Sequence, residues 1–465
     1  MWSGRFRQPL DPRFEQWQRS FPFDQKLLAY ELAASRAHAN TLRAADVISA
    51  DELKQIIFGL QEIAKHAGQE PGFLSDPEAE DVHHFVEKKL VASIGETGKK
   101  LHSGRSRNEQ IAADLRLFVR ETTDQLLRSI DQFLGALLER AEENASAVMP
   151  AYTHLQRAEP VLLPHWLLAY FEMFRRDAGR LHDCRKRVNE CPLGCGAVAG
   201  APLSLDRNIA SRELGFDRPA ANSMDATSDR DFVIEFVNAL SLLGLHLSRW
   251  AEELILFATQ EYGFIKLPEA YSTGSSAMPQ KQNPDAMELI RGKSARLIGC
   301  QVALAASVKG LPLAYNKDMQ ETQEPLLDAA ATAGACVEIA TGFMREVSFN
   351  CDRMRKACES GFMNALAAAT YLVRRGVPFR QAHEIVAHAV QKCVEKGCEL
   401  EQLTMEEFRV LSTAFDTDIY EHLKLEAVLD CHDVEGGTAM KRVQQALRTA
   451  RKHLAAMEEP HVTHA

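Results

Sequence analysis

Four polar clusters along the chain contain residue types that transfer protons or bind anions. They lie at His102–Asn108, Tyr152–Arg157, Tyr271–Pro284 and Gly310–Gln320. Each cluster interrupts a stretch with helical spacing, and loops and helix ends are where reactive groups are usually placed. The clusters therefore mark the part of the chain where chemistry is expected.

The first two clusters offer an anion site and a histidine. His102–Asn108 is rich in arginine and precedes a helix, and both arginine and the N–H groups of a helix start favour a carboxylate ligand. A solvated helix cap is the alternative. His154 lies between Pro150 and Pro160 just before another helix, where a lone histidine is more often structural than catalytic.

The third and fourth clusters offer a hydroxyl, a cation and amides. The glycine–serine loop that ends in Lys281 and Asn283 suits a closing lid with an active hydroxyl. A flexible surface loop is the alternative, although Met278 and the prolines make a mere linker a poorer explanation. The fourth cluster places Tyr315 and Gln320 at another helix start and is a weak signal alone.

Several stock motifs are absent, which narrows the chemistry. Gly194 and Gly196 are followed by Gly200 without a preceding strand pattern, so a dinucleotide site is disfavoured. His383 and His388 are five residues apart and do not form a zinc pair on a helix. The chain has no phosphate loop and no nucleophile elbow. We therefore expect neither a metal nor an organic cofactor.

The elements that must position these clusters are long helices. Apolar residues at three- and four-residue spacing predict five of them. They run from about Leu115 to Leu138, from Pro164 to Leu181, from Ser228 to Leu254, from Pro284 onward and from about Met319 to Met344. Ser228 is the expected N-cap of the third helix. No sustained strand alternation is present, so we predict an all-α chain that forms a homo-oligomer.

The composition is that of an ordinary soluble enzyme. Of 465 residues, 46% are hydrophobic and 25% charged, and the net charge of -10 opposes nonspecific binding to nucleic acid or anionic lipid. The ten cysteines show no C-x-x-C pairs and indicate free thiols in a reducing compartment. The most apolar run, between Glu235 and Arg249, is too short to cross a bilayer. We expect a cytoplasmic protein without a secretory signal, membrane or nucleic-acid partner.

The loop Gly274–Pro284 closely resembles the signature of the fumarase/aspartase superfamily. Four further segments resemble its argininosuccinate lyase/delta-crystallin branch: Leu101–Gln110, Tyr152–Arg157, Asn222–Asp231 and Leu313–Gln320. Met1–Phe6 and Tyr371–Arg380 do so as well. The resemblance implies three helical domains, expected at residues 1–106, 107–358 and 359–465. It also implies a central long-helix bundle shared by four subunits, with active sites built from three chains.

The resemblance assigns roles to individual residues. Ser275 corresponds to the catalytic serine of the mobile loop, His154 to the second acid/base group, Glu288 to the partner of that histidine and Lys281 to a stabiliser of negative charge. The positions that contact substrate in this family are Ser20, His83, Asn108, Thr153, Asn283, Tyr315, Gln320 and Gln323. Arg105 and Ser106 are placed less securely.

Three positions depart from the family pattern. Gln323 stands where a lysine commonly binds a substrate carboxylate, Gln282 stands where a second lysine is common, and Ser103 replaces a threonine. The amide of Gln323 still donates hydrogen bonds, and Lys317 is a nearby candidate for the missing charge.

The expected activity is the reversible elimination of fumarate from argininosuccinate to give L-arginine. Removing a C–H proton beside a carboxylate and protonating the departing nitrogen both need positioned acid–base groups. Two alternatives stay open at this point. One is another fumarate-releasing lyase of the superfamily, and the other is an inactive structural homologue, for which Gln323 is the best support.

Overall fold

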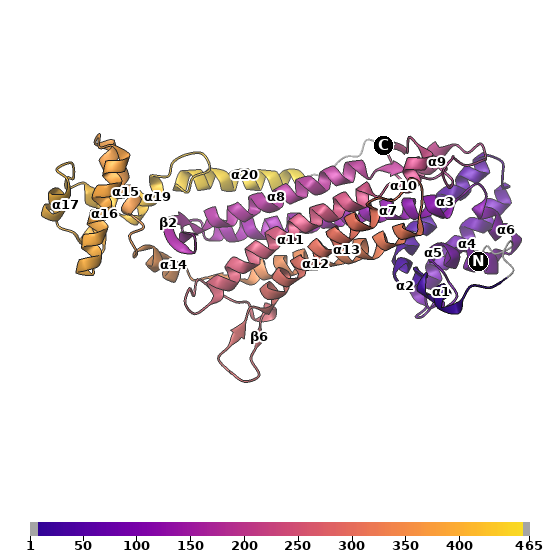
Figure 1. Ribbon diagram of the computed structural model, residues 1–465, viewed down its shortest axis with the longest axis horizontal. Helices are drawn as coiled ribbons and strands as arrows, with labels where there is room; N and C mark the ends of the chain where they lie inside the picture. Colours follow the sequence, from indigo (N-terminus) through magenta and orange to yellow (C-terminus); the bar gives the residue numbers. More distant parts are fainter. Residues whose placement is uncertain (1–7, 459–465) are drawn as a thin grey trace. The chain divides into compact units, whose positions relative to one another are not determined.

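The computed structural model describes residues 8–458, and the Met1–Phe6 segment lies outside the described residues. The chain is helical, with only short strands (Figure 1). Five long helices dominate: α7 (Arg107–Glu143), α8 (Leu163–Arg187), α11 (Asp231–Ala258), α12 (Asp285–Val308) and α13 (Gln323–Glu346). All five were predicted from apolar spacing, and the all-α class is confirmed.

One expected helix cap is wrong. Ser228 is the last residue of α10 (Ser223–Ser228) and does not begin α11. Asp229 caps α11 instead, because its Oδ1 accepts a hydrogen bond from the N–H of Asp231 at 2.7 Å.

The chain divides into two compact units. The first contains residues up to Leu127, Ala178–Leu242 and Ala295–Gly334. Its complete helices are α1 (Pro12–Trp17), α2 (Phe21–Asp24), η1 (Gln25–Leu27), α3 (Leu28–Ala44), α4 (Ala50–Gln69), α5 (Val82–Ile94), α6 (Glu96–Lys99), η2 (Lys100–His102), α9 (Arg207–Glu213), α10 and η4 (Lys317–Thr322). Small apolar residues of α3 and α7, Ala37 and Ala113 among them, pack in one buried cluster with Leu214.

The second unit contains Arg128–Asp177, Leu243–Ser294 and residues from Ala335 onward. Large aromatic rings join its helices: Phe133 of α7 packs edge-on against Phe174 of α8 at 4.9 Å and against Trp250 of α11 at 5.2 Å, and Trp250 meets Phe343 of α13 at 6.0 Å. These rings are fully buried, so they form the centre of the bundle in this unit.

The remaining helices of the second unit follow the bundle. They are η3 (Glu269–Tyr271), α14 (Cys351–Cys358), α15 (Ala365–Arg374), α16 (Phe379–Lys396), η5 (Leu400–Gln402), α17 (Met405–Leu411), α18 (Ile419–His422), α19 (Leu425–Asp430) and α20 (Met440–Glu458). A separate buried cluster that includes Leu372, Phe408 and Phe415 holds α15 to α18 together.

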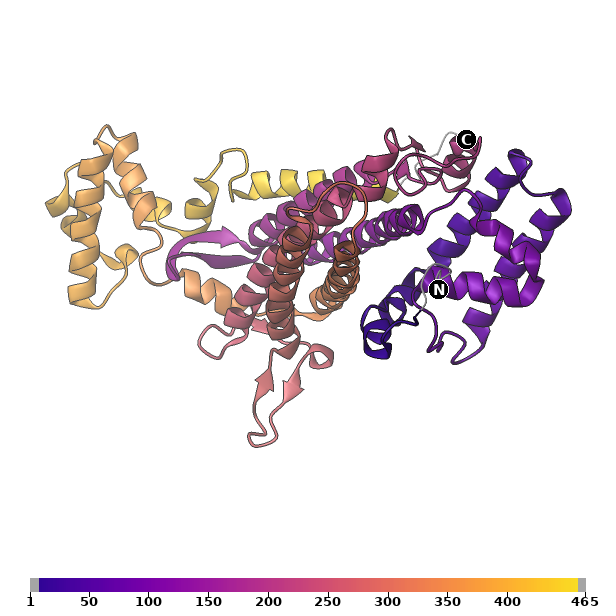
Figure 2. The same ribbon diagram turned by 45° about the vertical axis from the view of Figure 1, so that its right-hand side comes forward.

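The strands form four two-stranded pairs. They are β1 (Val148–Thr153) with β2 (Gln156–Leu162), β3 (Glu190–Cys191) with β4 (Arg218–Pro219), β5 (Ile265–Lys266) with β8 (Ser348–Phe349), and β6 (Thr273–Gly274) with β7 (Gln282–Asn283). The β6–β7 hairpin extends away from the start of α12 (Figure 2). Two of these pairs, β1–β2 and β6–β7, present candidate catalytic residues.

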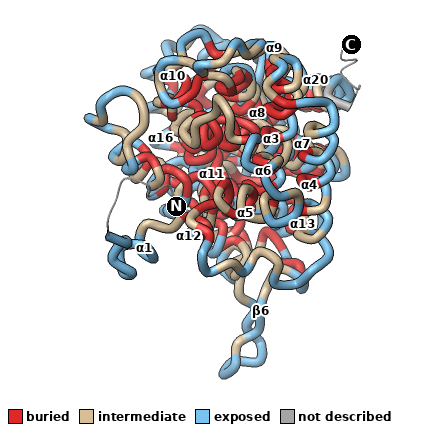
Figure 3. Tube along the Cα trace, turned by 90° about the vertical axis from the view of Figure 1, so that its right-hand side faces the viewer, coloured by how far each residue is buried: buried red, intermediate tan, exposed pale blue. Residues whose placement is uncertain are grey.

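Two segments among residues 8–458 are long and apolar enough to cross a membrane by length and composition: Asp231–Ala258 and Lys317–Glu346. The expectation that the apolar run near Leu240 is too short to span does not hold for the complete helix. Of the apolar window in each segment, 56% and 61% respectively is buried inside the chain, as Figure 3 shows for α11. Burial of this kind is typical of core helices.

Candidate active site

Ser275 lies in the loop that joins β6 to β7, directly after β6. Its Oγ accepts hydrogen bonds from the backbone N–H groups of Ala277 (3.2 Å) and Met278 (3.1 Å). Hydrogen bonds to the charged form of a group favour that form. Two backbone N–H groups of the loop therefore point at the Ser275 oxygen, an arrangement that would favour negative charge on it.

The same loop is tied to the first turn of α12. The carboxylate of Asp285 accepts hydrogen bonds from the N–H (3.2 Å) and the hydroxyl (2.6 Å) of Thr273. Asn283 pairs with Thr273 in the strand register, and Lys281 is exposed on the loop. The tie holds the base of the loop, while the β6–β7 segment extends away from the helices and is largely exposed (Figure 3).

His154 occupies the turn of the β1–β2 hairpin. Thr153 and Gln156 are the last paired residues, which leaves His154 and Leu155 as a two-residue turn with φ of 55° and 57°. Such a turn needs positive φ at both central residues and usually contains asparagine and glycine. Non-glycine residues in this conformation cost free energy and concentrate at functional sites. The strained turn presents the His154 ring to solvent.

Arg157 anchors the hairpin to the end of α14. Its guanidinium donates hydrogen bonds to the carbonyl of Ala357 (3.1 Å) and to the hydroxyl of Ser360 (3.0 Å). On the other strand, the ring of Tyr152 packs on Tyr262 at 5.5 Å. These two contacts oppose movement of the hairpin at both strands next to the turn.

Glu288 is exposed in the first turn of α12. Within the described part of the chain, no hydrogen bond or ion pair joins it to His154. The expected pairing of Glu288 with His154 thus stays a prediction, because the described residues of a single chain show no contact between the two side chains.

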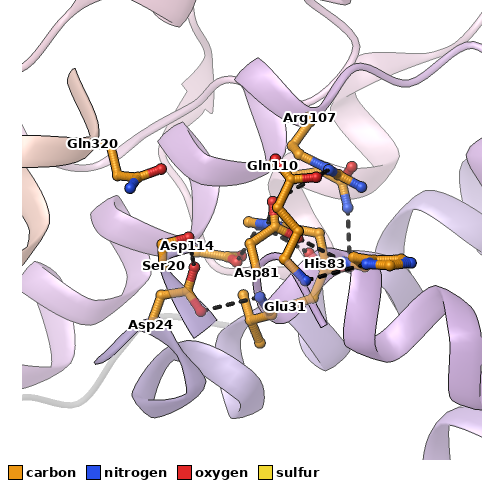
Figure 4. Close-up of polar contacts among 12 residues, drawn as sticks. Ser20, Asp24, Glu31, Asp81, His83, Arg107, Gln110, Asp114 and Gln320 are labelled. Atoms are coloured by element: carbon orange, nitrogen blue, oxygen red, sulfur yellow. Dashed lines mark hydrogen bonds and ion pairs between the residues drawn. The ribbon is translucent and has the colours of Figure 1, made fainter. Parts of the chain in front are cut away.

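Ser20 is buried at the start of α2. Its hydroxyl donates to the carboxylate of Asp24 at 2.6 Å, and its N–H donates to the carbonyl of Glu80 at 2.9 Å. Close by, Nε2 of Gln320 donates to the carbonyl of Gln18 at 3.0 Å. Figure 4 shows Ser20 and Gln320 on neighbouring segments. Two expected substrate contacts therefore lie together.

His83 lies behind this pair, 4% exposed. Its Nε2 is 3.1 Å from Asp114 and 3.8 Å from Glu31, and its Nδ1 is 3.7 Å from Asp81. The three carboxylates hold the pKa of His83 well above its ordinary value against the opposing effect of burial. In this position both ring nitrogens face the protein rather than an open ligand site.

A hollow of about 700 Å³, lined by Arg105 and by the segment from Gly196 to Pro202, lies at the start of α7. Ser106 caps the helix: its Oγ accepts from the N–H of Asn108 at 3.3 Å, and its own N–H donates to Glu109 at 2.9 Å. The other carboxylate oxygen of Glu109 accepts from the N–H of Gly196 at 3.0 Å. The glycine-rich segment thus lines the hollow beside Arg105.

Tyr315 of the fourth cluster lies near a buried cation, Arg230. Arg230 is fully buried, and its Nε and Nη2 have no hydrogen-bond partner among the described residues. Its charge opposes the rise that burial causes in the pKa of Tyr315. Gln323 is 3% exposed with an unpartnered Oε1, whereas Lys317 is half exposed and lies 3.6 Å from Glu80. Lys317 therefore already has a partner, which weakens it as the substitute for the missing family lysine.

The expected site residues fall in both units. The first contains Ser20, His83, Asn108, Tyr315, Gln320 and Gln323, and the second contains Thr153, His154, Ser275, Lys281, Asn283 and Glu288. The sequence reading missed the buried partners Asp24, Glu31, Asp114 and Arg230. For Glu31 and Asp114 the one available signal was a charge on an otherwise apolar helix face, which is weaker than a motif.

The chain resembles known lyases in sequence and in structure. A lyase family profile matches residues 4–299, and an argininosuccinate lyase C-terminal profile matches residues 362–430. Curated proteins named argininosuccinate lyase from Koribacter versatilis and Acidobacterium capsulatum are 58% and 57% identical, covering 99% and 97% of this chain and 98% and 94% of theirs.

Solved structures agree. An EDDS lyase in complex with formate has a TM-score of 0.85 at 27% identity, over 97% of this chain and 91% of its own. A class II fumarase from Schistosoma mansoni has a TM-score of 0.72 at 16% identity, over 86% of this chain and 90% of its own. The second likeness concerns the fold alone.

The helical fold and the lyase family profile together place the chain among the helical lyases. The extent of the sequence matches goes further: the chain belongs to the argininosuccinate lyase family.

Proposed function

We propose that the chain catalyses the reversible elimination of fumarate from argininosuccinate to give L-arginine, as a step of arginine biosynthesis, with its own side chains as the only catalytic groups. The observation that carries the proposal is the geometry of the loop that contains Ser275 and Lys281. The Ser275 hydroxyl accepts hydrogen bonds from two backbone N–H groups of this loop. Family membership supports the choice of substrate.

Ser275 removes the C–H proton next to a substrate carboxylate and acts as an alkoxide. The loop N–H groups, Lys281 and the start of α12 stabilise the charge on the serine and on the developing carbanion-like state. His154 donates a proton to the departing guanidino nitrogen, directly or through water. Glu288 holds the histidine in its working orientation. Reversibility exchanges acid for base in the return reaction.

The substrate is held by the remaining site residues. Those assigned to this task are Ser20, Asn108, Thr153, Asn283, Tyr315, Gln320 and Gln323. His83 contributes to substrate binding indirectly, by supporting the residues around Ser20, because both of its ring nitrogens face carboxylates. Amide and hydroxyl donors in this set, together with the hollow at the start of α7, suit a substrate with several carboxylates.

The working form is a homotetramer with active sites shared between chains. Large apolar side chains are exposed on the long helices, among them Leu245 of α11 and Leu289 and Val302 of α12. Exposed apolar side chains on these long helices support a subunit interface. The missing contact between His154 and Glu288 within one chain agrees with sites built from several chains.

The proposal also includes domain boundaries near residues 106 and 358. It further places the protein in the cytoplasm. The ten cysteines are free thiols in the structure, which suits a reducing compartment. The separate apolar cluster of α15 to α18 supports an independent C-terminal region.

A substrate panel tests the proposed function. Purified protein is mixed separately with argininosuccinate, adenylosuccinate, aspartate and malate, and fumarate is followed by its absorbance. We expect fumarate from argininosuccinate alone. Release from another compound instead would assign a different lyase activity, and no release from any of them would favour the inactive structural homologue.

A further inference from the structure

A cluster of buried charges connects α3, α5 and α7 behind the expected substrate contacts. Glu31, His83 and Asp114 are each at most 4% exposed, and their ligand-type atoms all lie within 4.8 Å of one another (Figure 4). Isolated charges are costly to bury, so such a cluster requires internal pairing.

Three carboxylates, Glu31, Asp81 and Asp114, face three basic groups, His83, Arg105 and Arg107, with Arg105 at 3.8 Å from Glu31 and Arg107 at 3.3 Å from Asp81. Burial and the neighbouring Glu31 raise the pKa of Asp114 to about 7, and the carboxylates raise the pKa of His83, so a proton is held between these two side chains. The separations also fit three ligands around a divalent ion. However, such an ion needs a free lone pair on His83 and would add charge beside Arg105, so a proton is the better occupant.

On one side, Glu31 orients Arg105. Its Oε1 accepts hydrogen bonds from the hydroxyl of Ser35 at 2.6 Å and from Nε2 of Gln110 at 3.0 Å. The Ser35 oxygen in turn accepts from Nη1 of Arg105 at 2.9 Å. Arg105 lines the hollow at the start of α7. The position of its guanidinium therefore depends on Glu31.

On the other side, Glu31 and Asp114 hold His83, and His83 faces Asp81. Asp81 caps α5 by accepting from the N–H of His84 at 2.7 Å. Val82, which follows Asp81 and begins α5, donates its N–H to Asp24 at 3.0 Å. Asp24 also accepts a hydrogen bond from the hydroxyl of Ser20 at 2.6 Å. A continuous series of contacts thus joins Glu31 to Ser20.

We propose that Glu31 is a positioning residue for substrate binding, which holds Arg105 and, through His83 and Asp81, the segment of Ser20 from one buried centre. The inference rests on the proposed function, because its readout is turnover of argininosuccinate. Its effect falls on segments that bind substrate and not on Ser275 or His154, which perform the proton transfers.

The variant Glu31→Gln tests the proposal. The amide retains the shape and one acceptor but removes the charge that Arg105 and His83 face. Because the displaced segments bind substrate and transition state alike, we expect KM to rise about tenfold with kcat within about twofold of the wild type. A fall in kcat at unchanged KM would overturn the proposal.

Asp177→Asn is a matched control. Asp177 is a 1% exposed carboxylate that pairs with Nδ1 of His246 at 2.7 Å in the second unit. We expect this variant to lower the melting temperature while KM stays unchanged. An equal rise of KM in both variants would mean a general loss of structure and would overturn the proposal.

Ser35→Ala decides the matter if Glu31→Gln does not fold. This variant keeps every charge and removes only the hydroxyl between Glu31 and Arg105, so KM should rise about threefold at an unchanged kcat. An unchanged KM contradicts the proposal. Failure of the wild-type protein to release fumarate would instead refute the proposed function, so the two failures are distinguishable.

Discussion

Gln323 is a residue at which the family resemblance leads us to expect a lysine that binds a substrate carboxylate. It is buried at the start of α13, and its Oε1 lacks a partner among residues 8–458. A charged donor at this position would give a substrate carboxylate a charge-assisted hydrogen bond, which contributes about 1.5–3 kcal/mol.

We predict that Gln323→Lys lowers KM by about tenfold or more in steady-state assays with argininosuccinate. Gln282→Lys is the matched control, because Gln282 also replaces a common lysine but donates to the hydroxyl of Ser272 at 2.7 Å within the loop base. Its KM should stay within about twofold of wild type. An unchanged or higher KM for Gln323→Lys would show that this position does not bind the substrate carboxylate.

Asp24 gives a prediction about pH. Burial raises its pKa from 3.8 to about 6, so the folded state disfavours the ionised carboxylate. Its contribution to stability is therefore complete below the unfolded pKa and is lost as the pH rises through about 6.

The asparagine of Asp24→Asn cannot ionise, so this variant does not lose that stability as the pH rises. Relative to wild type, its free energy of unfolding should increase by roughly 2 to 3 kcal/mol between about pH 4 and about pH 7. Denaturant unfolding at fixed protein concentration across this range measures the difference. A difference that does not vary with pH would mean that Asp24 titrates normally.

Among the elements, the β1–β2 hairpin has the least favourable backbone, since His154 and Leu155 both have positive φ. Arg157 is the main polar tie that holds the hairpin to α14. Displacing a catalytic group by a fraction of an ångström to an ångström is enough to slow proton transfer strongly.

We predict that Arg157→Met lowers kcat about tenfold, because His154 is then poorly oriented. Arg355→Met is the control: Arg355 lies on the same helix α14 but pairs with Glu426, so its removal should leave kcat near the wild-type value. Equal kcat values for the two variants would exclude a role of Arg157 in orienting the hairpin.

The elements also show where reasoning from sequence succeeds. The long helices follow from apolar spacing because their buried faces repeat over many turns. The β1–β2 hairpin escaped prediction, since Pro150 and Pro160, which lie opposite each other, are unfavourable signals for a strand. The Glu31 cluster also escaped, because its members are far apart in the chain and each resembles a solvated charge when read alone.

For the whole molecule, the account requires Ser275 and His154 of one active site to come from different chains. Ser275→Ala and His154→Ala are therefore each expected to be inactive alone. When the two variants are co-expressed, random assembly should restore roughly one quarter of the sites, because each site then has independent chances of receiving an intact serine and an intact histidine.

Activity of mixed tetramers, purified through two different tags, measures this complementation. Light scattering confirms the assembly size in the same samples. Mixed tetramers that remain as inactive as either variant alone would mean that both residues of a site belong to a single chain.

The central claim is that the hydroxyl of Ser275 performs the proton transfer in fumarate release. Its most direct test compares fumarate absorbance after argininosuccinate is added to wild type, Ser275→Ala and Ser276→Ala, with substrate binding measured by calorimetry. We predict normal turnover for wild type and Ser276→Ala. For Ser275→Ala we predict that kcat falls by about 1,000-fold or more while substrate binding is retained. Turnover of Ser275→Ala at nearly the wild-type rate would contradict the account.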